Sequence, residues 1–215
     1  MSYYAREGMW TRCFPAMRHI RDIIKDGKIG RVVCVQGDFG WSTSSCDPDH
    51  RIWYPRSGGM MLDIGMYMAQ LGQVAFPDAF VERCQAMGTK KNGVDHTVMA
   101  SILYGSTDDD DIVNEDRRRG MLQFYVTGEA NTEERVTIQG TSGRIVVDPP
   151  AHAPTVLRLF TDEGRSTSNE IIIKFSLPDD SFTTWNYPGS VGFTYQVQAV
   201  GDALHAGETE CPQCK

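Results

Sequence analysis

The sequence predicts an α+β fold in which an open, mainly antiparallel β-sheet has helices packed on one face. Upstream of Pro77 helical patterns dominate, whereas between Pro77 and residue 175 the chain reads as short strand-like segments. The links between successive strands are short, and short links imply antiparallel pairing. Alternation such as Val136/Ile138 leaves each strand one apolar face, so helices should cover one side of the sheet.

Composition limits the function classes. The chain has 215 residues, of which 40% are hydrophobic and 23% charged, as in a soluble globular domain with a sizeable core. Its net charge of -7 argues against nucleic acid or an anionic membrane as a partner. No apolar stretch approaches the ~20 residues that span a bilayer. Residues 1–7 lack the apolar core of a signal peptide, which predicts a cytoplasmic protein.

The six cysteines do not form a recognisable framework. They are scattered through the chain, at positions 13, 34, 46, 84, 211 and 214. Cys211 and Cys214 form a lone CxxC, which is at most half of a zinc site. We therefore expect no metal site.

The N-terminal third should contain a helix followed by a strand. Pro15 suits the first turn of a helix over residues 15–26, and Gly27 ends it. Residues 31–39 are β-branched and predict a strand. With an extended segment before the helix, these elements would form a crossover unit. Residues 41–56, rich in Ser, Asp and Pro, predict a loop, where substrate contacts usually lie.

A second helix is predicted over residues 59–75, which are apolar nearly all round and so typical of a buried helix. Asp63, Tyr67 and Gln70 are spaced i, i+4, i+7 and should share one helix face. A carboxylate and a phenol one turn apart suggest an acid/base pair facing a cavity. Alternatively, Asp63 favours the positive helix N-terminus and Tyr67 is a core residue with a satisfied hydroxyl. Spacing alone favours this structural alternative, because capping and ion pairing are commoner than catalysis.

Strands dominate the rest of the chain. Asn92-Gly93 is a strong hairpin signal between the first two. The predicted strands are residues 81–87, 94–104, 121–127, 135–139, 143–147, 155–160 and 170–175. Residues 105–120, with consecutive Asp and then consecutive Arg, predict a solvated acidic insertion. A last helix over residues 191–206 is indicated by the spacing of Phe193, Val197, Val200 and Leu204.

Several segments resemble one enzyme family. Residues 58–67, GGMMLDIGMY, are similar to the GGGxLLDIGxY segment of the Gfo/Idh/MocA oxidoreductases. Other segments agree in order along nearly the whole chain, at residues 7–15, 37–40, 51–53, 140–145 and 192–197. The resemblance is strongest to the branch that contains dimeric, NADP-dependent dehydrogenases of D-xylose and of cyclic trans-diols.

The resemblance implies roles for six residues. Tyr67 would be the catalytic acid/base. Asp63 would be a second catalytic residue, which lies beside the substrate and holds or orients its hydroxyl. Trp10, Phe39 and Arg51 would bind substrate, and Arg12 would lie near the cofactor. From the residues alone, Trp10 and Phe39 could equally be core aromatics, and Arg12 and Arg51 solvated charges.

The implied reaction moves a hydride between NADP and a secondary alcohol or lactol carbon while Tyr67 takes the hydroxyl proton. A free phenol has a pKa of about 10, so it needs a nearby cation to work as a base. Complete family members carry a Rossmann domain with GxGxxG and a Glu-Lys-Pro whose Lys is catalytic, and neither motif occurs here.

Residues 1–14 are accordingly interpreted as a remnant of that Rossmann domain. Residues 15–215 would form the substrate-binding and dimerisation domain, with its last helix truncated. Such a chain is expected to be inactive alone and to form a homodimer through its sheet. The alternative is a non-catalytic dimerisation or interaction module derived from the same family.

Overall fold

The computed structural model describes residues 8–106, 120–162, 168–179, 184–185 and 189–208. Most of the predicted acidic insertion and the CxxC segment lie outside these residues. Within them, eight strands form one sheet in the order β2-β3-β4-β1-β5-β6-β7-β8. The strands are β1 (Val32–Gly40), β2 (Ala79–Lys91), β3 (Val94–Ser106), β4 (Gly120–Thr127), β5 (Val136–Gly140), β6 (Gly143–Val147), β7 (Val156–Asp162) and β8 (Ser168–Lys174).

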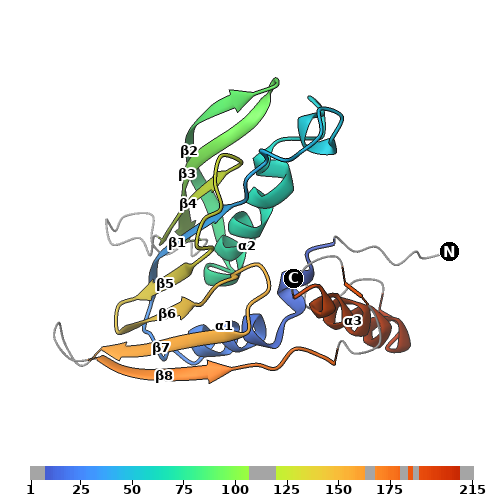
Figure 1. Cartoon of the computed structure of the whole chain (residues 1–215). Coiled ribbons are helices and arrows are strands. Elements are labelled where there is room, and N and C mark those ends of the chain that lie inside the picture. Colours follow the sequence, from blue (N-terminus) through green and yellow to red (C-terminus); the bar gives the residue numbers. More distant parts are fainter. Residues whose placement is uncertain (1–7, 107–119, 163–167, 180–183, 186–188, 209–215) are drawn as a thin grey trace.

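The sheet is antiparallel except at its centre, where β1 pairs in parallel with β4. The predicted α+β class and the mainly antiparallel sheet are thus confirmed. Strand β1 precedes all the hairpins in sequence, yet it lies between β4 and β5 and joins the two antiparallel groups of strands (Figure 1).

The helices α1 (Pro15–Lys25) and α2 (Met66–Ala75) lie side by side on one face of the sheet (Figure 1). Helix α3 (Phe193–His205) extends this layer sideways and packs chiefly on η1, a 3-10 helix at Trp10–Cys13. Residues 10–13, just before α1, form η1 and not the predicted extended segment, so the prediction is wrong for them. Residues 1–7 lie outside the described part of the chain. The predicted crossover unit is therefore not formed within residues 8–40. No helix in the described part of the chain is long and apolar enough to cross a membrane.

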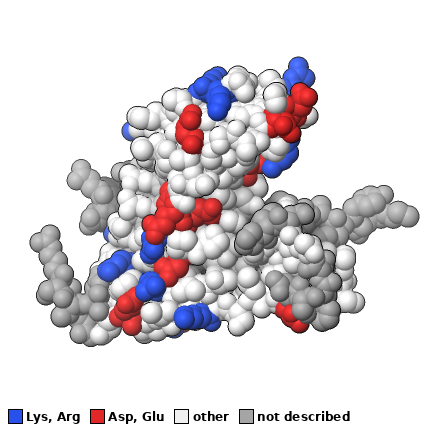
Figure 2. Space-filling view, in the orientation of Figure 1, with Lys and Arg blue, Asp and Glu red and all other residues white. Residues whose placement is uncertain are grey.

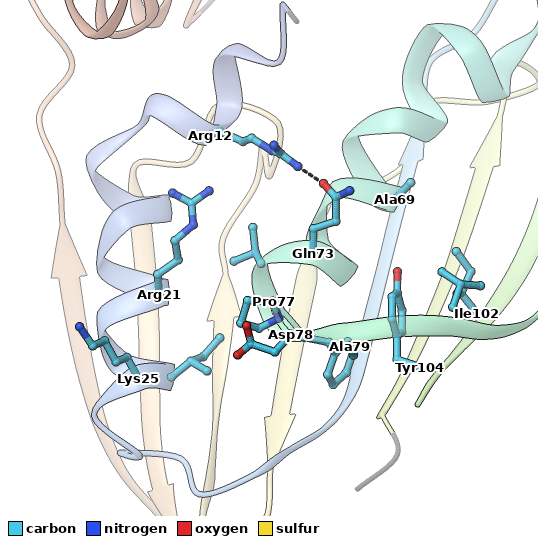
Figure 3. Close-up of a pocket in the computed structure, with 14 residues that line it drawn as sticks. Arg12, Arg21, Lys25, Ala69, Gln73, Pro77, Asp78, Ala79, Ile102 and Tyr104 are labelled. Atoms are coloured by element: carbon cyan, nitrogen blue, oxygen red, sulfur yellow. Dashed lines mark hydrogen bonds between the residues drawn. The ribbon is translucent and has the colours of Figure 1, made fainter. Parts of the chain in front are cut away.

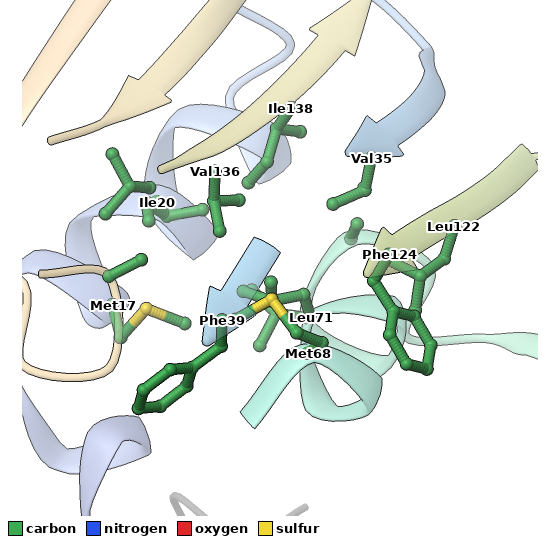
Figure 4. Packing of buried hydrophobic residues seen from close by; sticks show 14 of the residues in the cluster. Met17, Ile20, Val35, Phe39, Met68, Leu71, Leu122, Phe124, Val136 and Ile138 are labelled. Carbon is green, nitrogen blue, oxygen red and sulfur yellow. The ribbon is translucent and has the colours of Figure 1, made fainter. Parts of the chain in front are cut away.

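The core lies between the two helices and the sheet. Strand β4 shows the expected alternation, since Leu122, Phe124 and Val126 are buried whereas Met121 and Gln123 are exposed. Side chains from α1, α2 and the central strands converge here, among them Met17, Ile20, Val35, Phe39, Met68, Leu71, Leu122, Phe124, Val136 and Ile138 (Figure 4). The opposite face of the sheet has no helix from the described residues against it (Figure 1).

Charges of both signs are interspersed on the face seen in Figure 2. Asp148 accepts hydrogen bonds from Arg135 at 3.2 Å and from Arg158 at 2.8 Å, and Arg158 continues to Glu170 at 2.8 Å. These side chains are partly exposed, so solvent screens the ion pairs and each contributes little to stability. Together they connect the segment before β5 with strands β7 and β8.

Candidate functional site

The predicted central helix starts after Gly58 and Gly59. The backbone of Ile52 comes close to Gly58, and the side chain of Asp95 comes close to Gly59. Gly59 has a φ of +95°, and a Cβ there would overlap the carboxylate of Asp95 on β3. That carboxylate accepts a hydrogen bond from the backbone N–H of Met61 at 2.7 Å. A carboxylate at a helix N-terminus satisfies a free N–H group and interacts favourably with the helix dipole. Strand β3 thereby fixes the point at which this helix begins.

The first turn of the helix is wider than predicted. Met61–Gly65 (η3) form a π-helix, and α2 continues from Met66 to Ala75. A π-turn has more residues per turn than an α-helix, but residues four apart still lie close to one face in both. That Asp63, Tyr67 and Gln70 share one helix face stays a prediction, although Asp63 and Tyr67 have different partners.

The Asp63 carboxylate lies between two groups from the loop that precedes the helix. It forms an ion pair with Arg51, at the start of η2 (Arg51–Trp53), and accepts a hydrogen bond from Nε1 of Trp41 at 3.3 Å. The Asp63 side chain is 9% exposed, whereas that of Arg51 is 67% exposed. Both predicted polar residues therefore lie together, on the side of the helix that faces residues 41–53.

Tyr67 lies in an aromatic cluster with two other predicted residues. Its hydroxyl oxygen accepts a hydrogen bond from Nε1 of Trp10 at 2.9 Å, and its ring lies 5.6 Å from that of Phe39. Trp10 is buried and also stacks on Phe193, at the start of α3, with ring centroids 4.2 Å apart. Elements η1, β1, α2 and α3 thus bring Trp10, Phe39 and Tyr67 to one place.

Two further residues of this cluster were missed. His152, in the loop before β7, stacks on Phe39 at 4.9 Å and lies 5.8 Å from the Tyr67 ring. Its Nδ1 is 2.6 Å from Oε2 of Glu134. Both residues are in irregular segments 18 positions apart, and a single histidine between prolines carries no sequence signal for a site.

Arg12 faces a separate cavity of about 860 Å³ between α1 and α2 (Figure 3). Its guanidinium donates a hydrogen bond to Oε1 of Gln73. Arg21 and Lys25 of α1 line the same cavity, together with Asp78 and Tyr104. Burial, and then the charge of Cys84, raises the pKa of the Tyr104 phenol. Asp63, Tyr67, Trp10 and Phe39 do not line this cavity, so the predicted cofactor residue and the predicted substrate residues face different spaces.

In the described residues no group of three or more His, Cys, Asp or Glu side chains could hold a metal ion. Gln70 is the remaining polar residue of α2 near Tyr67. It is buried, and both atoms of its amide lack a hydrogen-bond partner among the described residues.

The family is decided by a comparison with family models. The model described as the GFO/IDH/MocA C-terminal domain matches residues 17–146, which is more than half of the chain. The chain belongs to the GFO/IDH/MocA family. The match covers most of α1, the central helix, strands β1 to β5 and most of β6, and so includes Phe39, Asp63 and Tyr67.

Similar curated proteins in this family are trans-1,2-dihydrobenzene-1,2-diol dehydrogenases. The pig enzyme is 25% identical over 211 residues, which are 97% of this chain and 56% of that enzyme. The zebrafish (Danio rerio) enzyme is 28% identical over 210 residues, or 96% of this chain and 55% of that enzyme. The chain thus spans about half the length of the curated relatives it matches.

Solved structures share the fold at lower identity. A levoglucosan dehydrogenase in complex with NADH and L-sorbose has a TM-score of 0.69 at 15% identity, covering 98% of this chain and 58% of that one. An aldose-aldose oxidoreductase from Caulobacter crescentus, complexed with glycerol, has a TM-score of 0.68 at 15% identity, covering 94% and 54%. A 3-ketoreductase from Actinomadura kijaniata with NADP has a TM-score of 0.62 at 15% identity, covering 95% and 54%. The curated relatives are thus diol dehydrogenases, and the solved structures show the fold that this chain shares.

Proposed function

We propose that this chain is the substrate half of an NADP-dependent oxidoreductase that acts on a sugar such as D-xylose or on a cyclic trans-diol. Tyr67 is the acid/base residue. The observation that carries the proposal is the hydrogen bond from Trp10 Nε1 to the Tyr67 hydroxyl, within an aromatic cluster that is not fully buried. An N–H donor directed at a phenol oxygen stabilises its anionic form, which is the form that accepts a proton.

The chain's own residues fit only part of a nicotinamide dinucleotide. The sequence has no Gly-x-Gly-x-x-Gly segment that could hold its pyrophosphate. Arg12, with Arg21 and Lys25 around the cavity between α1 and α2, forms a basic surface that would hold an anionic phosphate. When bound, the dinucleotide accepts or supplies the hydride. Because most of its binding groups would lie elsewhere, we expect no turnover by the 215-residue chain alone.

In the oxidative direction, the substrate hydroxyl gives its proton to the Tyr67 oxygen as the hydride leaves the same carbon. The carbonyl forms from the electron pair of the broken O–H bond. Trp10 orients the phenol, and Trp10 and Phe39 offer apolar faces to the substrate carbons. Asp63, held by Arg51 and Trp41, accepts a hydrogen bond from a second substrate hydroxyl.

The test joins this chain to the nucleotide-binding half of a family relative. Reduction of NADP is measured with D-xylose and with a cyclic trans-diol, and NAD is tested in parallel. Tyr67→Phe deletes only the hydroxyl, so kcat should fall ~10²- to 10⁴-fold, the usual contribution of a general acid/base, with nucleotide binding nearly unchanged. Tyr125→Phe, on the sheet face away from α2, is the matched control and should keep full activity. Activity of Tyr67→Phe within a few-fold of the parent would refute the assignment.

A second candidate function is a dimerisation or interaction module. Its support is the exposed face of the β2–β3 hairpin, where the cross-strand partners Met87 and Met99 are 75% and 55% exposed. Exposed apolar side chains that adjoin one another mark contact surfaces more often than isolated ones do. A homodimer through this sheet face is compatible with the catalytic proposal as well.

A further inference from the structure

His152 and Glu134 form a closely defined pair, although neither residue belongs to a motif of the sequence. The two side chains are 16% and 17% exposed, so the contact is shielded from most solvent. Glu134 has a φ of +59°, a conformation that costs free energy for a residue other than glycine. Such backbone strain persists where the surroundings impose it, and it is found preferentially at functional sites.

Several hydrogen bonds impose this arrangement. The Asp38 carboxylate accepts from the backbone N–H of Glu134 at 2.9 Å, and the Glu134 carbonyl accepts from Ala151 N at 3.0 Å. The carbonyl of His152 accepts a hydrogen bond from the hydroxyl of Thr11 at 2.5 Å. His152 is thus held in three ways: at its backbone carbonyl, at Nδ1 of its ring, and by stacking of the ring on Phe39.

The contact with Glu134 also determines which nitrogen is available. A carboxylate only accepts hydrogen bonds, so Nδ1 of His152 carries the hydrogen and donates it. In the neutral ring, Nε2 then has the free lone pair. None of the described residues makes a hydrogen bond with Nε2. The centroid of the His152 ring lies 5.8 Å from that of Tyr67 and 6.0 Å from that of Trp10.

We propose that His152 is a substrate-binding residue whose Nε2 accepts a hydrogen bond from a hydroxyl next to the one that reacts at Tyr67. Glu134 is the positioning residue that fixes the tautomer. The inference rests on the proposed function and deepens it, because it selects substrates with two neighbouring hydroxyls over simple secondary alcohols. The centroids of the His152 and Tyr67 rings are 5.8 Å apart, which is close enough for one small substrate to contact both side chains.

The first experiment uses the joined enzyme, in which this chain is fused to the nucleotide-binding half of a family relative. It compares trans-1,2-cyclohexanediol with cyclohexanol as substrates. His152→Phe keeps the stacked ring but removes both nitrogens, so kcat/KM for the diol should fall about 10- to 100-fold, as expected when a buried hydroxyl loses its partner. For cyclohexanol it should change less than about threefold, since no second hydroxyl is lost. The proposal would be overturned if kcat/KM fell equally for both substrates, because His152 would then be merely structural. It would also be overturned if kcat/KM changed for neither.

Glu134 is tested by a conservative pair of variants. Glu134→Gln retains an oxygen that accepts from Nδ1–H, so it should keep the preference for the diol within about threefold. Glu134→Ala removes the acceptor and should lose most of that preference. If both variants kept it, Glu134 would not position the ring.

A second experiment is independent of turnover and uses the 215-residue chain itself. The ¹⁵N resonances of the His152 ring should report hydrogen on Nδ1, and added trans-1,2-cyclohexanediol should shift the Nε2 resonance. Cyclohexanol at the same concentration should shift it much less. Hydrogen on Nε2, or equal shifts with the two alcohols, would overturn the proposal even if the joined enzyme were active. An inactive joined enzyme with the expected shifts would refute the proposed function and leave this site intact.

Discussion

Replacing Gly72 by alanine tests how tightly α2 is held against β3. A Cβ at Gly72 would overlap the hydroxyl and the ring of Tyr104. Tyr104 is 5% exposed and stacks on Phe76 with ring centroids 5.0 Å apart, so the ring cannot easily move away. Forcing an extra methyl group into such a packed contact costs ~1–3 kcal/mol. The better helix propensity of alanine returns ~1 kcal/mol, which leaves a net loss of ~0–2 kcal/mol.

Gly201→Ala in α3 is the matched control, because no atom lies within 4 Å of the added Cβ. That variant should gain ~1 kcal/mol from helix propensity alone. The difference between the two variants therefore isolates the overlap, at ~1–3 kcal/mol. Urea unfolding followed by circular dichroism measures it as a difference in midpoint at constant m. If Gly72→Ala were stabilised as much as Gly201→Ala, the tight contact between α2 and Tyr104 would not exist. In a Tyr104→Ala background the penalty should disappear.

The remaining predictions concern the start of the helix and the exposed sheet face. Asp95→Ala should destabilise the fold by ~0.5–2 kcal/mol, because Met61 N–H loses its acceptor, whereas Asp95→Asn should cost less. The midpoints of urea unfolding measure both losses. Equal values for the two variants would contradict the capping role. Analytical ultracentrifugation should show a homodimer that Met99→Arg converts to monomer. A parent chain that is monomeric at high micromolar concentration would contradict the dimer.

Local patterns predicted the elements, and resemblance predicted most of the aromatic cluster. The alternation in β4 and β5 was enough to assign the buried face, since period-2 burial is a property of each strand alone. The parallel pairing of β1 with β4 was not predictable, because it joins segments more than 80 residues apart. No local signal records which distant strand becomes the neighbour.

The candidate site was predictable only where a motif carried it. Trp10, Phe39 and Tyr67 were named from the resemblance, and the structure brings them together. Their roles stay predictions. The π-turn at Met61–Gly65 escaped detection because an apolar run has the same composition in a π-helix and in an α-helix. His152 and Glu134 escaped because their contact joins two loops, and periodicity says nothing about loops.

Two glycines of the central helix segment, Gly59 and Gly72, lie in close contact with β3. From sequence, a glycine inside a helix is only a penalty of ~1 kcal/mol relative to alanine. In the fold, Gly59 lies against Asp95 and Gly72 against Tyr104, and both partners are on the same strand. Strand β3 therefore holds the helix near both ends, which fixes its position along its axis and its rotation about it. Tyr67 lies between these two contacts, so β3 helps to position the helix residue whose hydroxyl accepts the hydrogen bond from Trp10.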